Sequence, residues 1–358
     1  MPPPSRRPEP RRGSRLRRGR HVRSRTGTIL GVLLLTLPVL VTGVLLRAAS
    51  QGDEAPRVSH RPPPAAGYFR TVPAGSWSQL PDDAACSDRV RRSTWEPRPE
   101  NQEPNQTLPN RRAVRAALSA RPRDGAANGY DPRFDSWALA RVTGGHTGTT
   151  DENIQWAACK WGLPDNLLRA IAVRESTWYQ DVRYASGRCV PNNGCGDMVD
   201  APTAATGVFC RGISRSGHDY EQDYGSGVCP RTFSIVGVMA WQNPDWGPMA
   251  GNQNGTFPFS RDSTAFALDY LGSFLRGCFE GWVPWLANTG DRSYAAGDLR
   301  GCVGAWYAGE WRSPLAMGYI GRVKDEEDAR TWLSTEFRLH DPPCSPTYGC
   351  PRLSGRPG

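Results

Sequence analysis

Residues 149–178 read TTDENIQWAACKWGLPDNLLRAIAVRESTW, and this stretch predicts two consecutive helices. Thr149 followed three residues later by Glu152 is a capping box, the signature of a helix start. Gly162 stands where the end of the first helix favours a left-handed residue, and Pro164 suits the first turn of the second helix. The pattern predicts a mainly α-helical domain that begins near this point.

An acid interrupts the apolar face of the second helix. Leu168, Ile171 and Ala172 have helical spacing, and Glu175 follows Ile171 by four residues, so it extends the same face. A desolvated carboxylate has a raised pKa, which suits a general acid. The alternative is a structural salt bridge, for which the sequence offers three neighbouring partners, Arg169, Arg174 and Arg183.

Three segments in order carry a resemblance to a known family. They are LLRAIAVRESTW at 167–178, SIVGVMAW at 234–241, and GAWYAGEW at 304–311 with YIGRV at 319–323. Together they resemble the Glu-Ser, Gly-Leu-Met-Gln and Ala-Tyr-Asn-Ala-Gly motifs of the soluble lytic transglycosylase (SLT) domain family, in the lysozyme-like superfamily. The resemblance covers about residues 149–339 and implies a lysozyme-like helical fold.

The resemblance also implies roles for individual residues. Glu175 would be the catalytic acid/base of a peptidoglycan lytic transglycosylase. It would protonate the β-1,4 glycosidic oxygen between N-acetylmuramic acid and N-acetylglucosamine, then accept the proton of the muramyl 6-hydroxyl as a 1,6-anhydro ring closes. No cofactor is implied. The expected substrate-binding residues are Ser176, Trp178, Ser234, Gly237, Met239, Trp241, Trp306, Tyr307 and Tyr319.

Departures from the family pattern keep two alternatives open. Ala240 stands in place of the family's glutamine, Trp306-Tyr307 replace its Tyr-Asn, and residues 186–231 form a cysteine-containing insertion. One alternative is a lysozyme-type muramidase, in which a second acid activates water. The acids available for that role are Asp181, Asp197, Asp200, Asp219, Glu221 and Asp223. The other alternative is a peptidoglycan-binding protein without catalytic activity.

The net charge of +9 is confined to the N-terminus. Residues 1–27 hold ten arginines and one acid, so the remaining chain is neutral, which argues against a nucleic-acid partner. Residues 26–46 follow without a charge and are long enough for a membrane helix. We therefore expect residues 1–25 to be a cytoplasmic tail, 26–46 a single-pass anchor in the cell membrane, and the body extracellular. A cleaved signal sequence followed by secretion is the alternative.

All ten cysteines follow the apolar segment, as expected for disulfides in an exported domain. Sequence-near pairs are Cys189 with Cys195 and Cys344 with Cys350, and Cys278 with Cys302 joins two predicted helices; no spacing fits a metal site. The expected organisation is a Pro-rich linker at 47–75, an accessory segment at 76–147, the catalytic domain at 148–340 and a tail at 341–358. We expect a helix at 111–118 and a strand at 137–142 in the accessory segment, and a helix at 261–279 in the catalytic domain.

Overall fold

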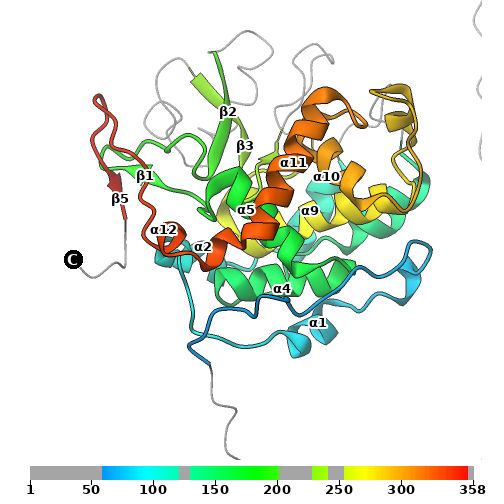
Figure 1. Ribbon diagram of the computed structural model, residues 1–358, viewed down its shortest axis with the longest axis horizontal. Coiled ribbons are helices and arrows are strands. Elements are labelled where there is room, and N and C mark those ends of the chain that lie inside the picture. The colour runs from blue at the N-terminus through cyan, green and yellow to red at the C-terminus, as the bar shows by residue number, and fades with distance from the viewer. Residues whose placement is uncertain (1–58, 121–129, 201–227, 241–253, 354–358) are drawn as a thin grey trace, which may run out of the picture. The chain divides into compact units, whose positions relative to one another are not determined.

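The computed structural model describes residues 59–120, 130–200, 228–240 and 254–353, which belong to one compact and mainly helical unit (Figure 1). The predicted tail at 1–25 and the predicted anchor at 26–46 lie outside these residues. None of the helices within the described ranges has the length and hydrophobicity that a membrane crossing requires.

Helices and short strands follow one another along the chain. The α-helices are α1 (Asp83–Arg89), α2 (Gln102–Gln106), α3 (Arg111–Ser119), α4 (Thr150–Trp161), α5 (Asp165–Ser176), α8 (Phe259–Asp262), α9 (Thr264–Phe279), α10 (Leu299–Ala308), α11 (Pro314–Ala329) and α12 (Thr335–Arg338). The strands are β1 (Arg183–Tyr184), β2 (Cys195–Asp200), β3 (Val228–Phe233), β4 (Val238–Met239) and β5 (Pro351–Arg352). The 3-10 helices are η1 (Trp77–Gln79), η2 (Pro99–Asn101), η5 (Pro284–Asn288) and η6 (Thr331–Leu333), and η4 (Phe134–Leu139) is a π-helix.

The predicted pair of helices is confirmed. The Thr149 hydroxyl accepts from the Glu152 amide and the Glu152 carboxylate accepts from the Thr149 amide, so the capping box starts α4, and Gly162 ends it at φ 61°. Pro164 is the N-cap of α5 rather than its first residue. Every residue of α4 is buried, because α1, α5 and α9 pack around it.

Helices α9, α10 and α11 complete the frame around α5. The predicted helix at 261–279 appears as α9, with Ser263 capping its first turn. The predicted disulfide between Cys278 and Cys302 ties α9 to α10. Helix α11 packs against both α10 and α5, so the two helices that carry the third motif, GAWYAGEW on α10 and YIGRV on α11, are held beside α5 (Figure 1).

Two sheets of short antiparallel strands flank the helices. Strands β2, β3 and β4 form one sheet in that order, with Thr232 opposite Met239, and β1 pairs with β5. The predicted disulfides Cys189–Cys195 and Cys344–Cys350 lie beside these strands. Strand β5 lies in the C-terminal tail and pairs with β1, so this tail is part of the folded unit.

Within the predicted strand at 137–142, residues 137–141 are helical. The alternation of WALARV suggested an extended segment, but η4 and the turn after it bury Phe134, Ala138, Leu139 and Val142. Those positions have helical spacing once Phe134 is included. Packing against the α4–α9 core therefore overrides the local alternation.

Residues 59–75 are docked on the domain, unlike the extended linker predicted at 47–75. The backbone amides of Tyr68 and Phe69 donate to the buried Asp165 carboxylate at 2.9 and 3.0 Å. The Arg276 guanidinium donates to the Val72 carbonyl at 2.7 Å. We call residues 59–75 the strap, because they run across the domain and bind it through backbone groups.

The accessory segment at 76–147 is joined to the same unit by an unpredicted disulfide. Cys86 of α1 bonds to Cys159 of α4, with a Cα–Cα distance of 5.6 Å. A buried ion pair adds to this join, because the Lys160 ammonium lies 2.7 Å from Asp83 and 2.8 Å from Asp269. The predicted helix at 111–118 appears as α3.

Candidate active site

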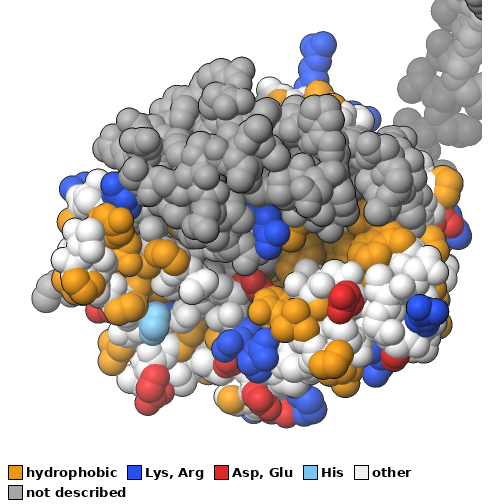
Figure 2. Space-filling view, turned by 90° about the horizontal axis from the view of Figure 1, so that it is seen from above, with side chains coloured by type: hydrophobic (Ala, Val, Ile, Leu, Met, Phe, Trp, Pro, Cys, Tyr) orange, Lys and Arg blue, Asp and Glu red, His pale blue; other side chains and the backbone are white. Residues whose placement is uncertain are grey.

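A cavity of about 940 Å³ opens where the end of α5 meets the β2–β4 sheet, α10 and α11. Figure 2 shows this face hollowed, with hydrophobic, basic and acidic side chains around the hollow. Its lining comes from α5 (Val173, Arg174, Glu175), the 191–196 loop, residues 231–234 with Gly237 and Met239, α10 (Trp306, Tyr307), α11 (Leu315, Tyr319, Arg322, Glu326) and the C-terminal segment from Thr331 to Pro343.

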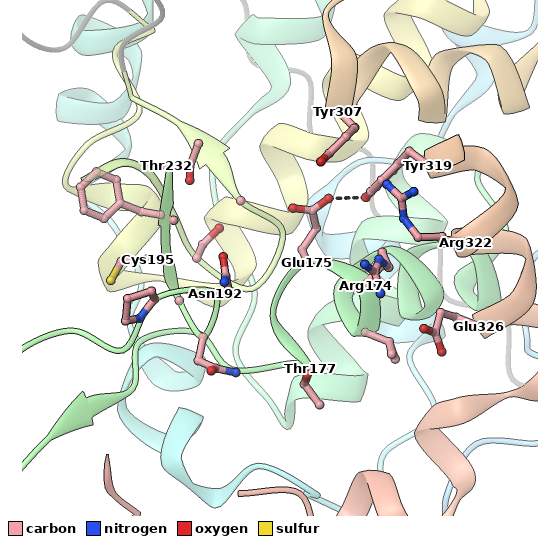
Figure 3. A pocket seen from close by; sticks show the side chains of 18 of the residues that line it. Arg174, Glu175, Thr177, Asn192, Cys195, Thr232, Tyr307, Tyr319, Arg322 and Glu326 are labelled. Atoms are coloured by element: carbon pink, nitrogen blue, oxygen red, sulfur yellow. Dashed lines mark hydrogen bonds between the residues drawn. The ribbon is translucent and has the colours of Figure 1, made fainter. Parts of the chain in front are cut away.

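Glu175 projects into this cavity from the last turn of α5. The helix ends at Thr177 and the chain reverses through two left-handed residues, Thr177 at φ 54° and Trp178 at φ 67°. Glu175 is half-buried, and the Tyr319 hydroxyl of α11 donates a hydrogen bond to its Oε1 (Figure 3). Burial raises the pKa of Tyr319 well above its usual value, and the Glu175 charge adds to the rise. Tyr319 therefore remains a protonated donor at neutral pH.

Gly237 brings the backbone against the other oxygen of the same carboxylate. It has a φ of 63°, and a Cβ built there would lie 2.7 Å from Glu175 Oε2. The Ser176 hydroxyl holds this turn to α5 by donating to the Ile235 carbonyl at 2.8 Å. The carboxylate is thus confined between a phenol on one side and a glycine turn on the other.

Two aromatic residues of α10 border the Glu175 site. Tyr307 stacks on Tyr319 with parallel rings whose centroids are 4.4 Å apart, and it is 47% exposed. The Trp306 indole donates to the Val236 carbonyl, which anchors α10 to the glycine turn. Flat rings at a cavity wall are suited to stacking on ligand faces.

The structure brings six of the predicted substrate-binding residues to the cavity wall. They are Ser234, Gly237, Met239, Trp306, Tyr307 and Tyr319, and they join Glu175 from three separate segments of the chain. Trp241 lies outside the described residues.

Ser176 and Trp178, the other two residues of the predicted set, are buried and do not line the cavity. The left-handed turn directs the Trp178 indole beneath α5, where it donates to the Arg169 carbonyl and packs against Trp95 and Phe337. Trp178 is therefore a core residue, and Ser176 acts through the Ile235 carbonyl.

Two of the three arginines suggested as salt-bridge partners of Glu175 bind other acids. Arg169 is buried between Asp151 and Asp165, at 2.7 and 2.6 Å. Arg183 lies 3.1 Å from Asp181. The third, Arg174, lines the cavity beside Glu175.

A muramidase requires a second acid, and the sequence offers six candidates for it. Asp181 is the one whose side chain is described, and it is bound to Arg183 outside the cavity lining. Two other carboxylates line the described part of the cavity, Glu326 and Glu336, and the sequence patterns did not single them out. Within the described ranges, no cluster of His, Cys, Asp and Glu is arranged to hold a metal ion.

The 191–196 loop forms a wall of the cavity, and none of the three sequence motifs includes it. The Cys189–Cys195 disulfide closes it, the Gly194 carbonyl accepts from the Ser234 amide at 2.8 Å, and the Asn193 side chain donates to the Ser176 carbonyl. The spacing of the two cysteines was the available signal, since it predicted a disulfide between them.

Comparison of the chain with protein-family models, with curated proteins and with solved structures found no match.

Proposed function

We propose that this protein is a peptidoglycan lytic transglycosylase with a lysozyme-like fold, which cleaves the bond between N-acetylmuramic acid and N-acetylglucosamine. The observation that carries the proposal is the confinement of Glu175 between the Tyr319 hydroxyl and Gly237 at the wall of a 940 Å³ cavity. Such a cavity is large enough for several sugar rings.

Each confining group has a part in the proposed reaction. Glu175 donates a proton to the glycosidic oxygen and, as the carboxylate, accepts the proton of the muramyl 6-hydroxyl when the anhydro ring forms. Tyr319 remains protonated and holds Oε1, so the carboxylate keeps one orientation through both proton transfers. Tyr307 and Trp306 offer ring faces for the neighbouring sugars.

The single-glutamate route of the proposal needs no second acid, and Asp181 is the candidate second acid whose side chain is described. That acid is held by Arg183 and does not line the cavity. Anchoring by residues 26–46 and an extracellular position of the body belong to the same proposal, because a wall-cleaving enzyme must reach the wall.

Product masses from purified peptidoglycan test the proposal. The full chain is expected to release muropeptides with anhydromuramyl ends, one water lighter than hydrolytic products. Glu175→Gln is expected to abolish release, while Glu326→Gln, a matched change elsewhere in the cavity, retains it. Hydrated ends alone would establish a muramidase instead. No products from either the wild type or Glu175→Gln would leave a binding protein, and identical products from both would show that Glu175 is not the catalytic acid.

A further inference from the structure

Two arginines face the cavity on the Tyr319 side of Glu175. Arg174 precedes Glu175 on α5, and Arg322 follows Tyr319 by three residues on α11, so both helices that position the acid also supply a cation. In Figure 3 the two side chains lie on the same side of the Glu175 carboxylate.

Neither arginine is neutralised by the described chain. Within the described ranges neither forms a salt bridge or a hydrogen bond, and Arg322 Nε is buried without a partner. Glu326 lies one turn after Arg322, the spacing of a helical ion pair, but its carboxylate accepts a hydrogen bond from the Thr331 hydroxyl. The acid four residues after Arg322 is thus engaged elsewhere.

The guanidinium of Arg322 is nevertheless held in place. It lies 5.8 Å from the centroid of the Tyr307 ring and 5.9 Å from that of Tyr319, and those rings stack on each other. Aromatic contacts of this kind orient a guanidinium without using its N–H donors. Its two terminal nitrogens therefore stay available to a ligand, whereas its Nε is buried.

We infer that Arg174 and Arg322 form a carboxylate-binding subsite beside Glu175. Arginine forks bind carboxylates by paired, charge-assisted hydrogen bonds, and a partly enclosed cavity strengthens such pairs. The other charged groups of the described lining are Arg231, His340, Glu326 and Glu336.

This inference rests on the proposed function, and it specifies the substrate as an acid-bearing glycan. A carboxylate reaches this position either as the lactyl acid of muramic acid or as an acidic residue of a peptide attached to it. Both sources present the same group to the arginines.

Binding assays on the full chain carrying Glu175→Gln distinguish the lactyl acid from the peptide acid as the source of the carboxylate. They also test the subsite separately from the proposed activity. The probes are N-acetylglucosaminyl-N-acetylmuramic acid with a free lactyl acid, its neutral lactyl methylamide, and the same disaccharide carrying an alanyl-glutamate dipeptide on the lactyl group. We expect Arg174→Gln and Arg322→Gln each to lower the affinity for at least one acidic probe about tenfold, which is about 1.4 kcal/mol. The affinity for the neutral methylamide is expected to stay unchanged.

Control variants test whether a loss of affinity comes from a general change of charge or from a folding defect. Lys324→Gln removes an exposed cation of α11 that pairs with Asp328 outside the cavity, and it is expected to change no affinity. Because Arg322 packs on two rings, Arg174→Gln supplies the independent variant, and Arg322→Lys is expected to recover part of the loss.

The outcomes distinguish the subsite from the activity. Arginine dependence of the free-acid probe identifies the lactyl group, and dependence of the dipeptide probe alone identifies the peptide; either supports the subsite, even if wild type releases no product. Equal affinity for acidic and neutral probes in every variant would overturn the subsite alone. Failure to bind any of the three would overturn the proposed function with it.

Discussion

Replacing Gly237 by alanine tests the confinement of Glu175. A left-handed residue with a side chain costs about 1–2 kcal/mol, and the new Cβ would lie 2.7 Å from Glu175 Oε2. Carbon and oxygen need roughly 0.5 Å more than this, so the carboxylate has to move. A 1 Å misplacement in an active site costs about a hundredfold in rate, and we expect Gly237→Ala to lose about tenfold to a hundredfold in turnover.

Gly309 supplies a matched control for the same backbone strain. Its φ is 64°, against 63° for Gly237, but a Cβ there would meet nothing within 4 Å. Both variants are expected to lower the unfolding temperature by roughly 2–4 °C. Only Gly237→Ala is expected to lower peptidoglycan turnover, measured by release of soluble muropeptides at equal protein concentration. Equal turnover in the two variants would refute the confinement.

Three further predictions concern other groups. Tyr319→Phe removes the donor to Glu175 and is expected to lower turnover roughly 10- to 150-fold with little loss of stability, as assayed by muropeptide release and thermal unfolding. Burial lowers the pKa of His146 to about 4 and raises the pKa of Glu96 to about 7. The unfolded His146 binds its proton more tightly than the folded one, so its contribution to stability falls as pH drops from 6.5 to 4, whereas that of Glu96 rises as pH drops from 7 to 4.5. In denaturant titrations, the free energy of unfolding of His146→Gln should therefore rise relative to that of the wild type as the pH falls, and that of Glu96→Gln should fall relative to it. Variant and wild-type profiles that stay parallel across this pH range would contradict the prediction. Removing the Cys86–Cys159 bond, which spans 73 residues, by a double alanine substitution is expected to cost about 4 kcal/mol, against about 2 kcal/mol for the 6-residue span of Cys344–Cys350; equal costs would argue against loop entropy as the source.

Local signals predicted the parts of the structure that local chemistry controls. The capping box at Thr149 satisfies amides within four residues of itself, and α9 is specified by the spacing of its own apolar side chains. Gly237 and Tyr319 approach Glu175 because the Ser176 hydroxyl ties the turn before β4 to α5, and because α11 packs on α5.

Features that depend on distant partners left no such signal. The strap binds through backbone amides and carbonyls, which every residue possesses, so its docking on Asp165 and Arg276 is invisible in the side-chain pattern. Trp178 adjoins the motif but occupies a left-handed turn, which reverses the direction of its ring. The partner of Cys86 is one of several possible cysteines, and only the packing of α1 on α4 selects Cys159.

The docked strap determines where the chain can be shortened. A truncation at residue 76, the boundary that the composition suggests, would remove the Tyr68 and Phe69 amides from Asp165 and the Val72 carbonyl from Arg276. Both side chains are completely buried with the strap in place, so each would lose hydrogen-bonding partners together with the segment that covers it. For recombinant work, an expression boundary ahead of Ser59 preserves the native solvation of two interior charges.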